Sequence, residues 1–298
     1  MQYTLNKSIT FSGKGLHTGK PVHMEIKPAP GNSGIVFHRT DTEEPTFIKA
    51  SWENVEISPL CTKLVKNNQS VSTIEHIMAA LSGCGIHNAL VEVNAPEIPI
   101  MDGSSVAFVR EILNVGRKKT QSPLRYLTIT KPVEVSEGSA FARLEPSNNF
   151  VINFEIDFKE KAIGFQKKSL KITPKSFARH LSASRTFCME SDISSMQNMG
   201  LALGGVPGEN SIVFGDNKVK SQGGLRFRNE PVRHKMLDAV GDLALAGYPI
   251  LGKYTGVKAG HALTNKLLVK LFTASQSSYV LTGENVKERP LWRREYAY

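Results

Sequence analysis

The sequence predicts an α+β protein, because strand-like and helix-like segments both occur in each half of the chain. In the first third, apolar and polar residues alternate over short runs, which is typical of half-buried strands: 3–11, 22–26 and 34–38. Good helix formers at 75–83 predict a helix, and the largely apolar run Ala-Leu-Val-Glu-Val at 89–93 predicts a further strand. The second half begins again with strand-like runs before its own helices, which supports the same class.

Other elements follow from local composition. The polar segment 114–123 resembles a linker, so we place a domain boundary there, between a first domain at 1–120 and a second at 126–298. The strongest helix signal covers 232–247, with a proline near its start and a glycine at its end. The remaining predicted elements are helices at 104–113 and 174–180 and strands at 126–135, 141–144 and 150–158.

One pattern occurs in both halves. A short helix opens on a histidine, His76 or His234, and a glycine and a strand-like run follow it. The pattern is short, so chance is one explanation. The other is that the chain holds two copies of one α/β unit, with a histidine from each near their junction.

Composition limits the classes of protein. The 298 residues carry 37 basic and 27 acidic side chains, and 37 − 27 gives a net charge of +10. That charge suits a solvated basic surface, nucleic acid, an anionic membrane face or a phosphorylated substrate. We expect no membrane-spanning segment and no signal peptide. Three scattered cysteines without a Cys-x-x-Cys motif favour the reducing cytoplasm and argue against a cysteine-based zinc site.

The helix at 232–247 carries His234, Asp238 and Asp242 at positions i, i+4 and i+8. Four residues turn a helix by about 400°, so these side chains lie along one stripe beside apolar residues. Burying such groups is expensive unless they are paired or bind a metal. The stripe therefore indicates either a His–Asp pair that joins two elements or a metal site with helical ligand spacing.

Glu75 and His76 open the first predicted helix, where Ser72 or Thr73 is the expected N-cap. Because adjacent residues project about 100° apart, a ligand and a base can share one site. The alternative is a capping-box glutamate in a Ser-x-x-Glu motif beside an unrelated histidine. His261 follows a glycine, a position that is more often structural, at a strand or loop edge.

Together these residues favour a metal-assisted hydrolase. Catalytic zinc takes three nitrogen or oxygen ligands and leaves one position open for water. His76, His234 and Asp238 form such a His₂Asp set, with Glu75 as general base. His261, oriented by Asp242, is then the candidate general acid.

Longer motifs extend from about residue 13 to 270. They lie at 15–19 (Gly-Leu-His-Thr-Gly), 72–76 (Ser-Thr-Ile-Glu-His), 93–104 (Val-Asn-Ala-Pro-Glu-Ile-Pro-Ile-Met-Asp-Gly-Ser), 185–187 (Arg-Thr-Phe), 223–227 (Gly-Gly-Leu-Arg-Phe), 232–238 (Val-Arg-His-Lys-Met-Leu-Asp) and 260–263 (Gly-His-Ala-Leu). In these motifs, their order and their spacing, the chain resembles the UDP-3-O-acyl-N-acetylglucosamine deacetylases, zinc enzymes of bacterial lipid A synthesis.

The resemblance implies the role of each matching residue. Zn²⁺ is held by His76, His234 and Asp238. The resemblance further implies Glu75 as general base, His261 as general acid with Asp242 as its carboxylate neighbour, Thr186 near the carbonyl, Lys235 near the substrate head group, and Phe158 and Phe187 near nucleotide and sugar. The implied fold is two tandem, similar α/β layered domains, each a sheet packed on helices, with the active site at their interface.

The implied reaction hydrolyses the N-acetyl group of UDP-3-O-acyl-N-acetylglucosamine to UDP-3-O-acyl-glucosamine and acetate. The implied partner is the acylated UDP-sugar rather than nucleic acid, and we expect a cytoplasmic monomer in peripheral contact with the inner membrane face. Segment 158–178 and the chain after 271 fit the family pattern poorly. We expect a loosely ordered basic tail at 284–298 and name Arg143 as the candidate diphosphate contact. The competing class is a basic, non-enzymatic nucleic-acid-binding protein.

Overall fold

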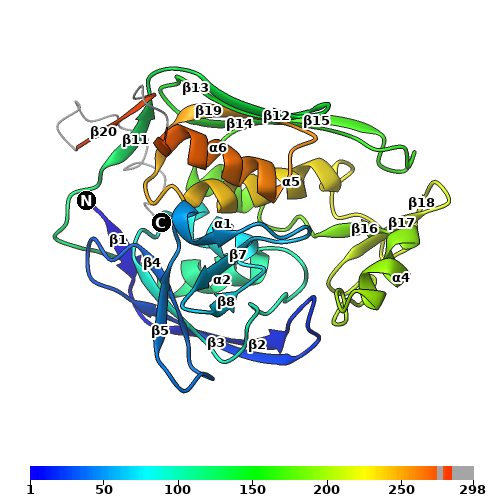
Figure 1. The fold of residues 1–298 in the computed structure, drawn as a ribbon, viewed down its shortest axis with the longest axis horizontal. Helices are drawn as coiled ribbons and strands as arrows, with labels where there is room; N and C mark the ends of the chain where they lie inside the picture. Colours follow the sequence, from blue (N-terminus) through cyan, green and yellow to red (C-terminus); the bar gives the residue numbers. More distant parts are fainter. Residues whose placement is uncertain (274–277, 284–298) are drawn as a thin grey trace.

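Two β-sheets form the outer layers of the molecule, and helices fill the space between them (Figure 1). The structure is a computed structural model, and it describes residues 1–273 and 278–283. The predicted α+β class is confirmed. The predicted tail at 284–298 lies outside the described residues.

The first sheet has five strands in the order β2-β3-β9-β4-β5, and only the central pair β4–β9 is parallel. Alternating burial along β4 places Ile35 and Phe37 on the covered face, as the period of a strand requires. The strands are β2 (Ile9–Lys14), β3 (Pro21–Pro28), β4 (Ile35–Arg39), β5 (Thr46–Lys49) and β9 (Ala89–Val93).

The second sheet repeats this topology. Its strands β12-β13-β19-β14-β15 pair in the same order and directions, with β14–β19 as the parallel pair. β11 and β20 extend it beside β19. The strands are β11 (Tyr126–Ile129), β12 (Val133–Glu137), β13 (Ala140–Glu145), β14 (Phe150–Asp157), β15 (Phe165–Lys171), β19 (Ile250–Val257) and β20 (Tyr279–Thr282).

Four helices fill the middle layers. α1 and α2 lie toward the first sheet and α5 and α6 toward the second (Figure 1), and α1 and α5 precede β9 and β19, the strands that correspond in the two sheets. The pattern of a histidine-bearing helix followed by a strand thus has a structural counterpart in both halves. The helices are α1 (Glu75–Gly83), α2 (Val106–Val115), α5 (Glu230–Ala244) and α6 (His261–Thr273).

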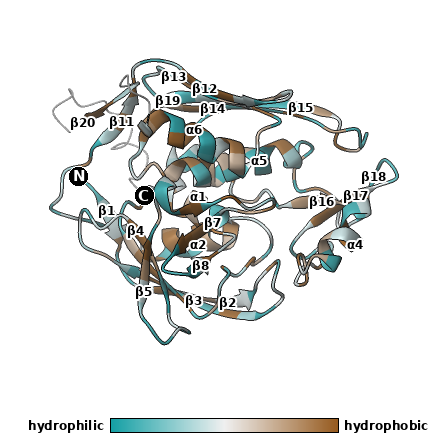
Figure 2. Ribbon diagram, viewed as in Figure 1, coloured by the Kyte–Doolittle hydropathy of each residue, from teal (hydrophilic) through white to brown (hydrophobic). Residues whose placement is uncertain are grey.

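Hydrophobic residues concentrate on the strands and on the helices that they enclose (Figure 2). A single buried apolar cluster includes residues of both halves, such as Ile77 and Leu81 of α1 and Leu237 and Val240 of α5. The 1–120 and 126–298 domain boundary therefore stays a prediction, because the core is continuous across it.

α1 and α5 cross in backbone contact, and Gly241 allows the approach. A Cβ atom built at Gly241 would lie 2.1 Å from the carbonyl oxygen of Glu75 and 3.1 Å from the amide nitrogen of Ala79. Any side chain there would push the helices apart. This crossing brings the first turn of α1 next to the stripe of α5.

Shorter elements connect these layers. Within the predicted linker, β10 pairs with β1 near the N-terminus. The short elements are β1 (Tyr3–Leu5), η1 (Trp52–Asn54), β6 (Val55–Glu56), β7 (Lys63–Lys66), β8 (Gln69–Val71), β10 (Arg117–Lys119), α3 (Pro174–His180), β16 (Phe187–Met189), α4 (Glu190–Asn198), β17 (Ile212–Gly215) and β18 (Lys218–Val219).

Three local predictions need correction. The strand-like run at 3–11 is two strands, β1 and β2, which belong to different sheets. The strand predicted at 126–135 is two strands, β11 and β12, and the break contains Pro132, which has no N–H to donate to a sheet. The N-cap of α1 is Ile74, which makes no side-chain capping hydrogen bond, rather than Ser72 or Thr73. The hydroxyls of Ser72 and Thr73 instead donate to residues of another segment, Ser72 to the Pro96 carbonyl and Thr73 to the Glu97 carboxylate.

Candidate metal centre and active site

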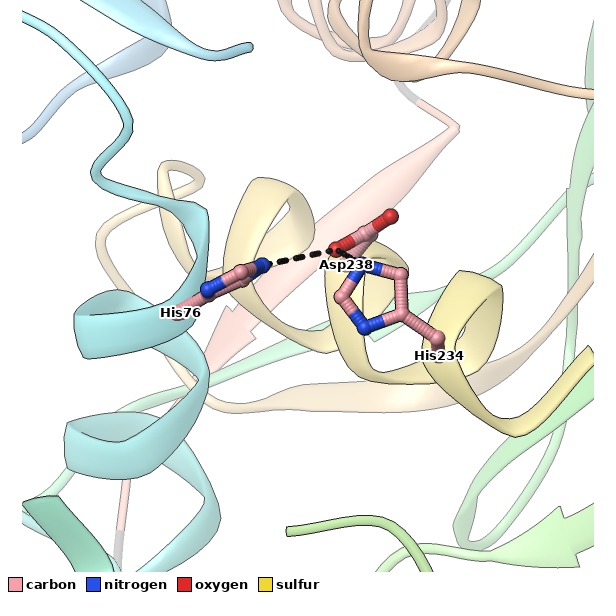
Figure 3. Close-up of side chains that lie close together, drawn as sticks. All are labelled: His76, His234 and Asp238. Carbon is pink, nitrogen blue, oxygen red and sulfur yellow. Dashed lines mark ion pairs between the residues drawn. The ribbon is translucent and has the colours of Figure 1, made fainter. Parts of the chain in front are cut away.

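His76, His234 and Asp238 meet where α1 crosses α5 (Figure 3). All three are nearly fully buried, and each offers a ligand atom within 4.8 Å of the others. Oδ1 of Asp238 lies 3.3 Å from Nε2 of His234 and 3.7 Å from Nε2 of His76. The helical spacing in α5 and the helix crossing together bring these residues into one cluster, as the sequence predicted.

One atom of this cluster shows that it suits a cation. Oδ1 of Asp238 is buried and has no hydrogen-bond partner among the described residues, although it faces both imidazoles. An unpaired buried carboxylate oxygen is costly. Ligand atoms about 2.0–2.2 Å from a tetrahedral metal lie about 3.4 Å apart, which matches the observed separations. The donor set therefore fits a divalent metal.

Contacts outside the cluster hold the imidazoles in a ligating state. Nδ1 of His234 lies 3.0 Å from the Ser184 carbonyl oxygen, so this nitrogen carries the proton and Nε2 faces the cluster. The Ser105 hydroxyl donates to the His76 carbonyl oxygen at 2.8 Å and anchors the first turn of α1. Burial lowers the pKa of His76 to about 3, so its ring is neutral, the form that binds metals.

Glu75 lies beside the cluster, where the charges of His261, Asp238 and Asp242 influence it. Its Oε2 atom accepts a hydrogen bond from the Thr62 backbone N–H at 2.9 Å. Burial raises its pKa to about 7. The capping-box alternative is therefore wrong, because the carboxylate bonds to a distant segment and not to the start of its own helix.

His261 and Asp242 form a hydrogen-bonded pair. Nδ1 of His261 lies 2.8 Å from Oδ2 of Asp242, and the Thr62 hydroxyl donates to Oδ1 at 2.6 Å. Burial lowers the pKa of His261, but the Asp242 carboxylate outweighs burial and raises it to about 9. His261 is the first residue of α6, so it opens a helix that the sequence analysis missed.

Lys235 contacts the cluster directly, whereas Thr186 is positioned through its backbone. Nζ of Lys235 donates to Oδ2 of Asp238 at 2.6 Å. Burial lowers the pKa of Lys235, but Asp238 reverses this and keeps the pKa above its ordinary value. The backbone of Thr186 is bonded on both sides, from its N–H to the Gly103 carbonyl and from the Ile212 N–H to its own carbonyl, each at 2.8 Å.

The two predicted aromatic residues lie together. The rings of Phe158 and Phe187 are 5.6 Å apart and edge to face, and the Phe187 ring lies 6.3 Å from that of His234. Arg143, the candidate diphosphate contact, forms ion pairs with Glu145 at 3.1 Å and Glu134 at 3.8 Å. Its guanidinium is thus partly engaged by acidic neighbours.

The sequence analysis missed two residues that organise this site. Thr62 bonds to both Glu75 and Asp242, and Ser184 orients His234 through its backbone. Thr62 lies 180 residues from Asp242 in the chain, and any residue offers the carbonyl that Ser184 provides. Neither contact leaves a local pattern.

A cavity of about 1010 Å³ lies elsewhere, between the halves beside the N-terminus. Its lining includes Tyr3, Trp52 and Tyr248 and none of the predicted site residues. No described helix combines the length and apolarity that crossing a membrane requires.

Comparison with known proteins agrees with the geometry. The model of the UDP-3-O-acyl N-acetylglycosamine deacetylase family matches residues 2–273. The chain is 45% identical over 270 residues to a protein of Geobacter sp. (strain M21), covering 91% of this chain and 88% of that one. It is 43% identical over 293 residues to one of Sodalis glossinidius (strain morsitans), covering 97% and 96%.

A protein of Syntrophus aciditrophicus (strain SB) is 40% identical over 297 residues, covering 97% of this chain and 94% of that one. All three relatives bear the name UDP-3-O-acyl-N-acetylglucosamine deacetylase. The resemblance drawn from the motifs is thereby confirmed, and the nucleic-acid-binding alternative gains no support. The chain belongs to the UDP-3-O-acyl N-acetylglycosamine deacetylase family.

Proposed function

We propose that this protein hydrolyses the N-acetyl group of UDP-3-O-acyl-N-acetylglucosamine, giving UDP-3-O-acyl-glucosamine and acetate in lipid A synthesis. Family membership supports the substrate class. The observation that carries the chemistry is the buried Oδ1 of Asp238, which has no donor among the described residues and faces two imidazole nitrogens beside Glu75.

His76, His234 and Asp238 would hold the metal. Two imidazoles and a carboxylate suit Zn²⁺, although Fe²⁺ also tolerates such a set. When bound, the ion supplies a Lewis acid, which favours negative charge on an amide oxygen and eases the deprotonation of water. Lys235 holds the second oxygen of Asp238, so that its first oxygen stays directed at the histidines.

Glu75 is the general base. Its carboxylate lies outside the ligand set and is held by the Thr62 N–H, so it can take the proton of an attacking water. The proposed role of the Thr186 hydroxyl is to donate a hydrogen bond to the carbonyl oxygen as negative charge develops there. Its backbone is fixed by bonds to Gly103 and Ile212, so donation needs little reorganisation.

His261 is the general acid. An amide nitrogen leaves only when it is protonated, and the Asp242 carboxylate keeps His261 charged at neutral pH. Phe158 and Phe187 offer apolar ring faces and edges beside His234 for the nucleotide and sugar. Lys235 contributes a positive charge close to the head group.

We place the enzyme in the cytoplasm as a monomer that touches the inner membrane face when it takes up an acylated substrate. Three cysteines without a disulfide are typical of a reducing compartment. The net charge of +10 suits both a diphosphate and an anionic lipid surface.

The test is a deacetylation assay on a UDP-3-O-acyl-N-acetylglucosamine, run beside metal analysis of the same sample. We expect release of one acetate per substrate and loss of activity when a chelator removes the metal. A metal-loaded, folded protein that releases no acetate would contradict the proposal. Retention on a nucleic-acid column at moderate salt with no bound metal would favour the competing class instead.

A further inference from the structure

Arg185 and Glu230 form a buried ion pair close in the chain to residues of the proposed active site. Nε and Nη2 of Arg185 approach Oε1 and Oε2 of Glu230 at 3.0 and 3.3 Å. Arg185 is 5% exposed and Glu230 is fully buried. A pair so removed from water is retained at a large desolvation cost, which its other hydrogen bonds must offset.

Those hydrogen bonds join three separate segments. The Glu230 carboxylate also accepts the backbone N–H groups of Arg185 at 3.0 Å and Arg226 at 2.6 Å. Nη2 of Arg185 donates to the Gly224 carbonyl oxygen at 2.7 Å. The loop at 184–186, the loop at 224–226 and the first turn of α5 therefore converge on one carboxylate.

The converging segments carry groups assigned to the reaction. Arg185 stands between Ser184, whose carbonyl oxygen orients His234, and Thr186, the proposed donor to the substrate carbonyl. Glu230 lies one helical turn before His234 on α5. The ion pair thus connects the loop that bears the hydroxyl to the helix that bears two of the metal ligands.

We propose that Arg185 and Glu230 are positioning residues, which hold the Thr186 hydroxyl and the Ser184 carbonyl at a fixed position relative to α5. The proposal rests on the proposed function. Neither side chain needs to touch the substrate. Their contribution is to fix the distance between the hydroxyl and the metal ligands before the reaction begins.

A purely structural ion pair is the competing explanation, and the chain offers a matched control. Arg39 is also buried, makes a two-point contact with Asp41 at 2.7 and 2.8 Å, and donates to the Ser70 carbonyl. None of these groups belongs to the site. Asp41→Asn should lower the melting temperature and leave kcat within about twofold of wild type.

The test compares Glu230→Gln, Arg185→Met and the double variant with wild type. We expect each single variant to lose about 10- to 100-fold in kcat per metal-loaded site, with KM within about threefold. The double variant leaves no lone buried charge, so its melting temperature should recover toward wild type. Its kcat should stay low, because the ion pair that positions the 184–186 loop against α5 is still missing.

Two results would overturn the proposal: a kcat that recovers together with stability in the double variant, or a loss no larger than that of the control. If a single variant does not fold, the positioning role is tested with the double variant and with Arg185→Lys. Arg185→Lys keeps the charge but not the two-point contact, so its kcat should also fall. Wild-type turnover is measured in the same series. Its absence would refute the proposed function, whereas wild-type turnover with unaffected variants would refute only the positioning role.

Discussion

At the scale of residues, the site is defined by ionisable side chains that are buried away from water. The Thr62 N–H and hydroxyl bond to Glu75 and Asp242, and Lys235 bonds to one oxygen of Asp238. The other oxygen of Asp238 has no donor among the described residues, and a bound cation would satisfy it. In the proposed mechanism, these few polar atoms would separate metal binding, proton uptake and proton donation within one buried cluster.

Replacing Glu75 by glutamine should remove the base and keep the metal. The amide oxygen of glutamine can still accept the Thr62 N–H, so the local structure persists. We expect kcat to fall by about 10²- to 10⁴-fold. Steady-state kinetics with metal analysis checks this, and Glu92→Gln on the first sheet is the control. A near-wild-type rate in metal-loaded Glu75→Gln would remove Glu75 from its role.

Asp242→Asn should move the basic limb of the pH profile. In wild type the pKa of His261 is raised to about 9, so turnover should fall as the pH rises through about 9 and the donor loses its proton. In the variant the Asp242 carboxylate no longer offsets burial, and only the charge of Glu75 still opposes it, so the pKa of His261 should drop to its ordinary value of about 6.5 or below. At pH 7.5 kcat should then fall at least about tenfold.

Profiles of kcat from pH 6 to 10 test this shift. Asp216→Asn, at an exposed turn, is the matched control and should leave the limb in place. The His261–Asp242 pair also contributes to the stability of the fold. This contribution is fully present below about pH 6.5 and is lost as the pH rises through about 9. An unchanged limb in Asp242→Asn would show that another group donates the proton.

At the scale of elements, the crossing of α1 and α5 assembles the site. α5 supplies Glu230, His234, Asp238 and Asp242 along one stripe, at intervals of four residues. α1 supplies Glu75 and His76 from its first turn. Since Gly241 lies against the backbone of α1, the distance between the two helices depends on its missing side chain.

Gly241→Ala tests this dependence. In an exposed helix alanine would add about 0.8–1.0 kcal/mol of stability over glycine. Here its Cβ would lie 2.1 Å from the Glu75 carbonyl oxygen, so overpacking should win and destabilise the protein by about 1–3 kcal/mol. Urea unfolding measures the change. Gly260→Ala, which meets open space, should lose far less, and equal losses would contradict the close crossing.

At the scale of the whole molecule, two halves with one strand topology place their corresponding helices against each other. The candidate metal ligands are His76 from the first half and His234 and Asp238 from the second. A bound ion would therefore link the two halves through ligands that no single half provides. Ions that bind only the folded state raise its stability by mass action.

Metal removal should lower the melting temperature. At a metal concentration about 1,000 times Kd, linkage predicts about 4 kcal/mol of stabilisation. Thermal unfolding of chelated and reloaded protein measures this shift. His76→Ala should lose the metal and melt at one temperature whether metal is added or not. A metal-dependent shift that persists in His76→Ala would exclude His76 from the ligand set.

The sequence by itself determined the α+β class, the α5 stripe and the motifs that identify the family, because helical periodicity and motif spacing are local properties. Only the tertiary structure decided that Gly241 joins α1 to α5, that Thr62 bonds to Asp242 across 180 residues, and that Ser72 and Thr73 bond across the fold and do not cap α1. These contacts join distant segments, so packing and not propensity selects them. The same limit explains why the Arg185–Glu230 pair had no signature in the sequence.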